Sequence, residues 1–399
     1  MHQTNLLKNK DFLKLLIAQG VSDFGDGVAF LGFIMVVLYR HSGTAVETSL
    51  IFICASLPVL IVGPFAGVFV DRWNRKHTMI VSDILRAAAV CILIFVENLW
   101  GIYFVVFIVS TLSRFFYPAR GAIIPNIVGK ENVHRANGIS QAVMYAMSVF
   151  SPSASGVLIG LLGVKSVFVL DAISFLFSGM IVFSLRYRED SVSAKPGSVS
   201  GVLMEMKTGV KLIQKTPQVR YILLSFSVIL LFAGPVNVLY LMFLRDVMKL
   251  DIVWVGYLES VFGLGAVCGG IILSLLPKST RNADILVGGT FSGLVIAFLV
   301  FFPKLLIVTI GLFLVGCLIV FINVPPTAIV QKTIADRARG KVLSVMNALF
   351  QMMNMVSMIL VSIALSIVDI RHILIIGGLL LTVLGIFFFS RNEIRKLLG

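Results

Sequence analysis

The sequence contains few charged residues for its length. Only 13% of its 399 residues are charged, against about a quarter in soluble domains, whereas 58% are hydrophobic. This composition excludes a soluble globular domain and indicates a polytopic membrane protein. The first apolar run is too long for a cleavable signal peptide, and many further runs follow it.

Cysteine and histidine are also scarce, and neither forms a reactive cluster. Cys54, Cys91, Cys268 and Cys317 fall within apolar segments and form no CxxC pair, so neither a disulfide framework nor a zinc site is supported. The five histidines lie at span ends or in loops, which argues against an intramembrane enzyme. No metal and no cofactor are expected. A GxxxxGK[ST] phosphate loop is absent, so this chain does not hydrolyse ATP.

Long apolar segments dominate what is present. Each is long enough to cross a hydrocarbon core of about 30 Å as a helix. The sequence predicts twelve transmembrane helices, at residues 13–39, 46–70, 78–97, 100–123, 136–162, 166–186, 220–244, 252–276, 284–302, 305–331, 341–367 and 371–390. The predicted fold class is therefore an all-α membrane protein.

The positive charges indicate an orientation. The formal net charge is +14, and roughly 24 of the 33 Lys and Arg residues fall on the side that holds both termini and the 71–77 loop. The positive-inside rule places both termini in the cytoplasm, with the protein in the cell membrane. We expect attraction to lipid headgroups as a secondary effect and no binding of nucleic acid.

The longest polar stretch divides the chain into six and six predicted spans. We expect an N-terminal six-helix bundle at 1–187, a cytoplasmic linker with an amphipathic helix at 188–218, and a C-terminal six-helix bundle at 219–399. "PARGAIIPNIVGKENVHRANG" from Pro118 aligns with "PPTAIVQKTIADRARGKVLS" from Pro325, and Gly67 corresponds to Gly270. These similarities predict two pseudo-symmetric halves with a binding site near the membrane midplane.

One charged loop carries a specific motif. "GVFVDRWNRKH" resembles motif A of the major facilitator superfamily, in which it closes the cytoplasmic side while the transporter faces outward. The resemblance assigns this gating role to Gly67, Asp71, Arg72, Arg75 and Lys76. Glycine permits close helix packing and a carboxylate can cap a neighbouring helix N-terminus. Plain positive-inside anchoring would explain the cations but neither Gly67 nor Asp71.

Asp83 and Arg86, spaced i, i+3 in the third span, either neutralise each other locally or join this gate. A second pattern, on the fifth span, resembles the antiporter motif C. It keeps Gly138, Pro152 and Gly156, replaces two glycines with Ser151 and Ser155, and departs at Met147. Small residues and a proline let helices pack and bend there.

Shorter segments narrow the resemblance. "VSDFGDG", "FFYPARGAIIP", "LDAISF", "AGPVNVLY" and "VGYLESVFGLGAVCGG" resemble the macrolide-efflux-type branch of drug/proton antiporter-like proteins. That branch contains or borders siderophore exporters and a lysophospholipid transporter. The resemblance runs nearly end to end and implies a secondary transporter with alternating access.

Ionisable residues inside spans are the candidates for proton coupling, because each costs a few kcal/mol unless it is paired or hydrated. Asp26 lies midway along the first span, and Asp23 lies about one turn away on nearly the same face. Two neighbouring carboxylates in a low dielectric favour proton uptake, although Asp26 can instead cap a local bend. Arg114 lies at a depth comparable to Asp23, so an ion pair between them is expected to switch.

Further positions complete the set of candidates. Arg120 is expected to reach the membrane edge. Asp171 is expected to start or pack a helix. Glu259 can bind a cationic solute or a proton, or can be a satisfied carboxylate that faces water. The predicted substrate cavity draws on polar and aromatic residues within spans, namely Tyr145, Asn237, Tyr240, Tyr257, Asn323, Asn347, Gln351 and Asn354.

Together these features predict a monomeric exporter of amphipathic or cationic small molecules, driven by the proton motive force. The 31 Phe and 15 Met residues suit a soft apolar wall better than a sugar site. The alternatives are a lysophospholipid or siderophore exporter on the same fold, a uniporter without proton coupling, and a non-transporting membrane sensor or scaffold.

Overall fold

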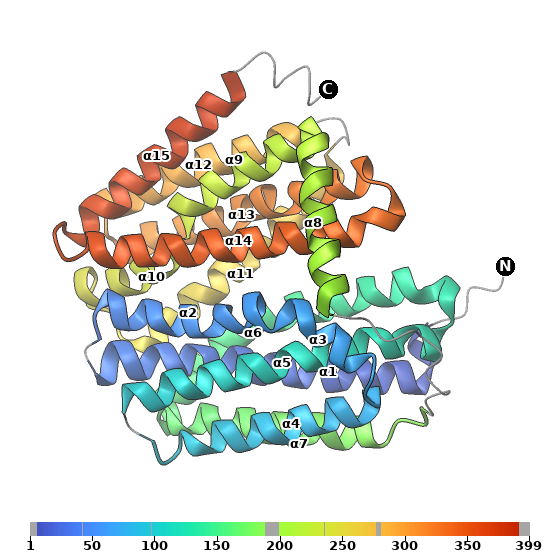
Figure 1. Cartoon of the computed structure of the whole chain (residues 1–399). Helices are drawn as coiled ribbons and strands as arrows, with labels where there is room; N and C mark the ends of the chain where they lie inside the picture. The colour runs from blue at the N-terminus through green and yellow to red at the C-terminus, as the bar shows by residue number, and fades with distance from the viewer. Residues whose placement is uncertain are drawn as a thin grey trace. The chain divides into compact units, whose positions relative to one another are not determined.

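The computed structural model describes residues 6–41, 43–96, 98–187, 199–234, 236–276 and 281–390 (Figure 1). These residues form helices and turns and no strand. The chain divides into two compact units. The first comprises Met1–Ser42 and Leu50–Val202, and the second comprises Gly43–Ser49 and Leu203–Gly399.

The first unit contains the helices that hold the buried charges. They are α1 (Lys10–Met35) with a π-helical turn at Val36–Arg40, most of α2 (Ala45–Ile61), α3 (Gly63–Val70), α4 (Arg75–Ile92), α5 (Leu99–Val128), α6 (Val133–Leu162) and α7 (Lys165–Phe183). Asparagines begin three of them: the side chains of Asn9, Asn74 and Asn98 accept backbone N–H groups at the starts of α1, α4 and α5.

The second unit contains the remaining helices. They are α8 (Val199–Lys215), α9 (Pro217–Ala233), α10 (Val236–Met242) with a π-helical turn at Phe243–Val247, α11 (Ile252–Leu275), α12 (Arg281–Phe301), α13 (Leu305–Thr333), α14 (Asp336–Ala364) and α15 (Ile370–Ser390). From Leu203 onward, the predicted linker helix α8 belongs to this unit. It packs on α14, where Lys341 lies 3.4 Å from Glu205. The predicted flexible part of the linker, 188–198, lies outside the described residues.

Each of the twelve predicted spans is helical over most of its described residues, but the helices differ in whether they are long and apolar enough to cross a membrane. Within the described residues, nine helices are long and apolar enough to cross, and α2 with α3 forms a further pair that is bent by 50°. α4 falls short because it carries Arg75, Lys76, Asp83 and Arg86 within its 18 residues. In α12 the described apolar stretch is Val287–Phe301. The total of twelve spans and the cytoplasmic termini therefore stay predictions.

Helix α1 is the centre of the first unit, because α6 and α7 both pack against it. Its glycines alternate between the two neighbours. A Cβ atom at Gly27 would lie 2.6 Å from the Ser151 side chain of α6, and one at Gly25 would lie 2.6 Å from the Asp171 carboxylate of α7. Small residues thus bring three helices together around Asp26.

In the second unit, α11 and α13 make the closest approach of backbones. Cβ atoms at Gly265 and Gly269 would overlap the backbone of α13 at Phe313 and Cys317, and one at Gly316 would overlap the backbone of α11 at Phe262. This is the packing that a small-xxx-small pattern permits in membranes. It fixes the position of the α11 segment that carries Glu259.

Candidate functional site

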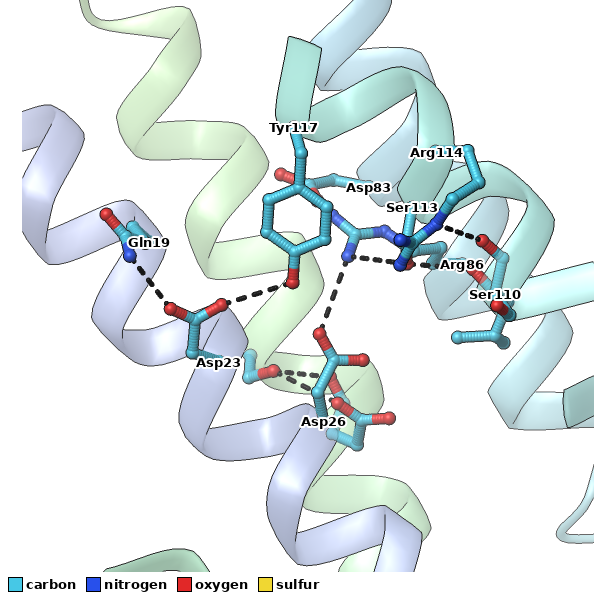
Figure 2. Close-up of polar contacts among 12 residues, drawn as sticks. Gln19, Asp23, Asp26, Asp83, Arg86, Ser110, Ser113, Arg114 and Tyr117 are labelled. Carbon is cyan, nitrogen blue, oxygen red and sulfur yellow. Dashed lines mark hydrogen bonds and ion pairs between the residues drawn. The ribbon is translucent and has the colours of Figure 1, made fainter. Parts of the chain in front are cut away.

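Arg86 of α4 lies at the centre of a buried polar cluster in the first unit (Figure 2). Its side chain has no exposed surface. One Nη atom donates to Asp83, one turn earlier on α4. The other Nη lies 3.6 Å from the Asp26 carboxylate of α1 and donates to the Ser113 hydroxyl of α5 at 3.4 Å. Arg86 therefore links three helices.

Two aromatic rings enclose this guanidinium. Its central carbon lies 4.6 Å from the ring centre of Phe116 and 4.3 Å from that of Phe175. Aromatic faces attract a planar cation, and they also exclude water from it. The ion pairs with Asp83 and Asp26 therefore operate in a low dielectric, where losing one partner is costly.

Asp171 of α7 is another buried acid in the neighbourhood of Asp26. It is 1% exposed, and the Ser174 hydroxyl donates to its backbone carbonyl at 2.8 Å and to its carboxylate at 3.4 Å. Because α7 begins at Lys165, Asp171 is beyond the first turn and does not start the helix. Its carboxylate packs against Gly25, one residue before Asp26.

Asp23 has a separate set of partners. The Gln19 amide donates to its carboxylate at 3.0 Å, and the Tyr117 hydroxyl donates at 3.4 Å (Figure 2). Gln19 also donates to the Ser140 carbonyl of α6 at 3.0 Å. Asp23 and Asp26 thus occupy two adjoining polar networks and do not share one site.

The expected Asp23–Arg114 ion pair is absent from the described residues. The Arg114 Nε atom instead donates to the Ser110 carbonyl at 3.3 Å, and its guanidinium lies 5.5 Å from the Tyr117 ring centre. Arg120 lies 5.6 Å from the same ring and has buried nitrogen atoms, so it does not reach for the membrane edge. Similar depth on two helices did not make these side chains partners, because each helix face points elsewhere.

A cavity of about 430 Å³ adjoins the cluster within the first unit. The Asp26 side chain is 30% exposed and forms part of its wall. The wall is otherwise apolar and aromatic, with hydroxyl groups and one arginine, and consists of Asp26, Gly27, Phe30, Phe33, Ala55, Val106, Val109, Ser110, Ser113, Arg114, Tyr117, Ser148 and Pro152. Asp26 is therefore the acid that can meet both a solute in this cavity and Arg86.

The sequence analysis singled out Arg114 on α5 but missed the other residues of its polar face, Ser110, Ser113 and Tyr117. Ser110, Ser113, Arg114 and Tyr117 follow i, i+3, i+4, i+7 spacing, and all four line the cavity. That spacing on an otherwise apolar helix was the available signal. Tyr145, the first-unit residue predicted to line the cavity, is 64% exposed and is not part of this wall.

The residues that resemble motif C join α6 to α1 next to Asp26. The Ser155 hydroxyl donates to the Val28 carbonyl of α1 at 2.8 Å, and the Ser151 hydroxyl donates to the Met147 carbonyl at 2.5 Å. Pro152 lies within the helix and Gly156 is buried. Gly138 differs from the expectation, since a Cβ atom there would meet no other atom within 4 Å.

The motif A loop also differs in detail from its expected chemistry. A Cβ atom at Gly67 would meet nothing within 4 Å, so this glycine permits no close helix contact in this structure. Asn74, and not Asp71, caps the start of α4, by accepting the His77 N–H at 3.0 Å. Asp71 is itself the residue that ends α3.

Two basic residues of motif A donate to backbone carbonyl groups in or just after neighbouring helices. The Lys76 ammonium donates to the Leu185 carbonyl at 2.8 Å and lies 5.5 Å from the Phe183 ring centre. Arg75 donates to the Ala122 carbonyl of α5 at 3.5 Å. For Arg86 the sequence left open local pairing with Asp83 or membership of this gate; in the structure it pairs with Asp83 and also lies 3.6 Å from Asp26 in the buried cluster.

The second unit contains the other candidates. Glu259 of α11 and Tyr240 of α10 line one cavity there, of about 100 Å³. Tyr257 is 48% exposed and lies beside Trp254. Asn323 and Asn347 are exposed, whereas Gln351 and Asn354 are partly buried. The Asn237 side chain lies outside the part of the chain that is described.

Comparison with known proteins identifies the family. The Major Facilitator Superfamily profile matches residues 15–358, and the chain belongs to this family. The fold agrees: the crystal structure of nucleoside transporter NupG superposes with a TM-score of 0.74 at 13% identity, covering 96% of this chain and 98% of that one. The chain is thus a multi-pass membrane transporter of small molecules and not an enzyme.

Several relatives bear the names of efflux proteins. Macrolide efflux protein A of Streptococcus pyogenes is 24% identical over 377 residues, which cover 91% of this chain and 92% of that protein. Multidrug efflux pump Tap of Mycolicibacterium fortuitum is 24% identical, with 86% of each chain covered. The match to the uncharacterized MFS-type transporter YfiS of Bacillus subtilis (strain 168), at 28% identity, covers 55% of this chain and 53% of that protein.

Proposed function

We propose that this protein exports amphipathic or cationic small molecules in exchange for protons that enter the cell. The observation that carries the proposal is the position of Asp26. Its carboxylate lines a 430 Å³ cavity and at the same time lies 3.6 Å from a fully buried arginine. A single acid can therefore respond to a proton, to a cationic solute and to Arg86 on α4.

The exchange follows from competition for this carboxylate. When Asp26 is ionised, it pairs with Arg86 and can attract a cation from the cavity. When a proton neutralises Asp26, that attraction ends and only Asp83 remains as the ionic partner of Arg86. Because the pair joins α1 to α4, its loss changes the balance between the conformations of the transporter.

The cavity wall suits an amphipathic solute. Phe30, Phe33 and Tyr117 offer aromatic surface, whereas Ser110 and Ser148 offer hydroxyl groups. Such a wall can bind varied apolar solutes and attract organic cations. The macrolide and multidrug efflux names of the relatives point to the same class of cargo. We assign the motif A residues the gating role that the family resemblance implies.

Reconstituted liposomes test this proposal. The purified protein is supplied with ethidium, tetraphenylphosphonium or a macrolide, and an imposed pH gradient should drive uphill movement. Asp26→Asn should lose this uphill movement while keeping exchange at equal pH. Glu205→Gln is the matched control, because its carboxylate is 61% exposed on α8. Equal uphill transport by Asp26→Asn and wild type would refute the proposed role of Asp26.

Other results of the liposome assay would identify one of the alternative functions. Movement of a lysophospholipid or a siderophore, and of none of the three probes, would identify a different cargo on the same fold. Downhill movement that ignores the pH gradient would identify a uniporter. If no solute moves, the protein acts as a sensor or scaffold and the proposal is wrong.

A further inference from the structure

The second unit encloses an apolar cavity with a single acid in its wall. The cavity measures about 100 Å³ and is bounded by α10, the π-helical turn that follows it, α11, α12, α13 and α15. Among the described residues, Glu259 and the Tyr240 phenol are the ionisable side chains in the wall. Most of the remaining wall is buried aliphatic surface, such as Val308 at 1% exposed and Leu374 at 4%.

Glu259 differs from the acids of the first unit because it has no partner. Among the described residues, no side chain and no backbone group forms a hydrogen bond or an ion pair with its carboxylate. An isolated carboxylate in an apolar site is costly to keep ionised. Glu259 therefore needs either a proton or a cation that enters the cavity.

Three aromatic rings share the cavity with this acid. Tyr240, Phe243 and Phe262 all line it, and Phe243 is only 3% exposed. A carboxylate combined with aromatic faces is the recognition chemistry of methylated ammonium groups, which shed water easily and attract ring faces. A phosphate would find no cation among the described residues of this wall, and a sugar would find only the Glu259 carboxylate and the Tyr240 hydroxyl as polar side-chain partners.

The size of the cavity limits the ligand further. An apolar cavity of about 150 Å³ is known to accept benzene. At about 100 Å³ this one accepts a slightly smaller group, such as a dimethylammonium or trimethylammonium head, and not a whole drug molecule. The rest of an amphipathic ligand would have to remain outside the cavity.

We propose that this cavity, lined by Glu259, Tyr240, Phe243 and Phe262, is a binding site for the methylated ammonium head of amphipathic cations. The inference builds on the proposed export function and gives its cargo a more specific chemical class. The binding step itself does not require transport, so it can be measured on the purified protein alone.

The test compares two probes of equal shape. Phenyltrimethylammonium carries the charge, and tert-butylbenzene is its neutral isostere. Calorimetric titration of the detergent-solubilised protein, with protein-free micelles as the blank, gives the affinity for each. Wild type should bind the cation, and Glu259→Gln should weaken that binding about tenfold or more with little change for the neutral probe.

A second variant measures how much an aromatic ring contributes to binding of the cation. Phe262→Leu keeps an apolar wall but removes one ring face, so binding of the cation should weaken about threefold to tenfold. Glu205→Gln, on the exposed face of α8, should leave both affinities unchanged. Failure of wild type to bind the cation, or equal binding of the cation by Glu259→Gln and wild type, would overturn the inference.

The two proposals fail in different ways. If cation binding depends on Glu259 but no solute moves in liposomes, the site is real and the export function is wrong. If uphill export depends on Asp26 but cation binding ignores Glu259, the export function stands and the Glu259 site is wrong.

Discussion

The two units of this protein treat buried charge in opposite ways. In the first unit, Arg86 lies between Asp83, Asp26 and two aromatic rings, and its two Nη atoms donate to Asp83 and to Ser113, although its Nε atom and one Asp83 oxygen have no hydrogen-bond partner among the described residues. In the second unit, Glu259 stands in an apolar cavity without a partner among the described residues. Both arrangements are costly in a membrane, but only the first is compensated within the protein.

This difference indicates that the two units have different functions, energy coupling in the first and binding of a cation in the second. A compensated cluster can change its pairing when one proton arrives, which suits energy coupling. An uncompensated acid must be neutralised from outside, which suits binding of a cation. The following predictions test that contrast, beginning with the largest expected effect.

Asp26→Asn should abolish the uphill export driven by a pH gradient, whereas Asp23→Asn should retain most of it. Only Asp26 both lines the cavity and pairs with Arg86, while Asp23 is held by Gln19 and Tyr117. Initial rates of uphill transport in liposomes measure the difference. A larger loss in Asp23→Asn than in Asp26→Asn would reverse the assignment.

Arg86→Met should destabilise the folded protein by about 3–5 kcal/mol, because it leaves the fully buried Asp83 carboxylate and the partly exposed Asp26 carboxylate without their cation. Glu259→Gln in the second unit should change stability by less than about 1 kcal/mol, since no ion pair is broken there. Thermal unfolding of the purified variants gives both values. Adding Asp26→Asn and Asp83→Asn to Arg86→Met should recover much of the loss, and an absence of recovery would argue against a charge-based cause.

Gly269→Ala should destabilise the second unit by about 1–3 kcal/mol, whereas Gly270→Ala should be neutral or slightly stabilising. A Cβ atom at Gly269 would overlap the Cys317 carbonyl of α13, but one at Gly270 meets nothing within 4 Å. The two glycines are adjacent on α11, so each controls for the other in thermal unfolding. Equal losses would show that α11 and α13 do not pack this closely.

Ser155→Ala should have the smallest effect, a loss of about 0.6 kcal/mol. The variant removes only the hydrogen bond from the Ser155 hydroxyl to the Val28 carbonyl. Unfolding temperature again measures it, and Ser148→Ala is the control because that hydroxyl bonds within its own helix. A loss of several kcal/mol would mean that motif C does more than join α6 to α1.

Much of the fold could be predicted from sequence because each span is an apolar run with polar ends. Asp26 was also predictable, since a carboxylate midway along an apolar helix stands out. The pairing of Asp26 with Arg86 could not be predicted in the same way. The sequence offered Asp83 or the motif A loop as the partner of Arg86; the pair with Asp83 is present, but the contact with Asp26 was not foreseen.

Side-chain pairing required knowledge of helix rotation, which depth alone does not give. Arg114 and Asp23 were matched by depth, but their helix faces point them to Ser110 and to Gln19 with Tyr117. The role of Gly67 was also inferred from its motif alone. In this structure no atom approaches its Cα closely enough to need a glycine.

The most direct test of competition between proton and solute for Asp26 measures the protons that are released when a solute binds. Purified protein in weakly buffered detergent near pH 7 is mixed with tetraphenylphosphonium, and a pH indicator records the protons released. Wild type should release up to about one proton per bound cation, and Asp26→Asn should release none. Equal release by the two proteins would contradict the claim that proton and solute compete for Asp26.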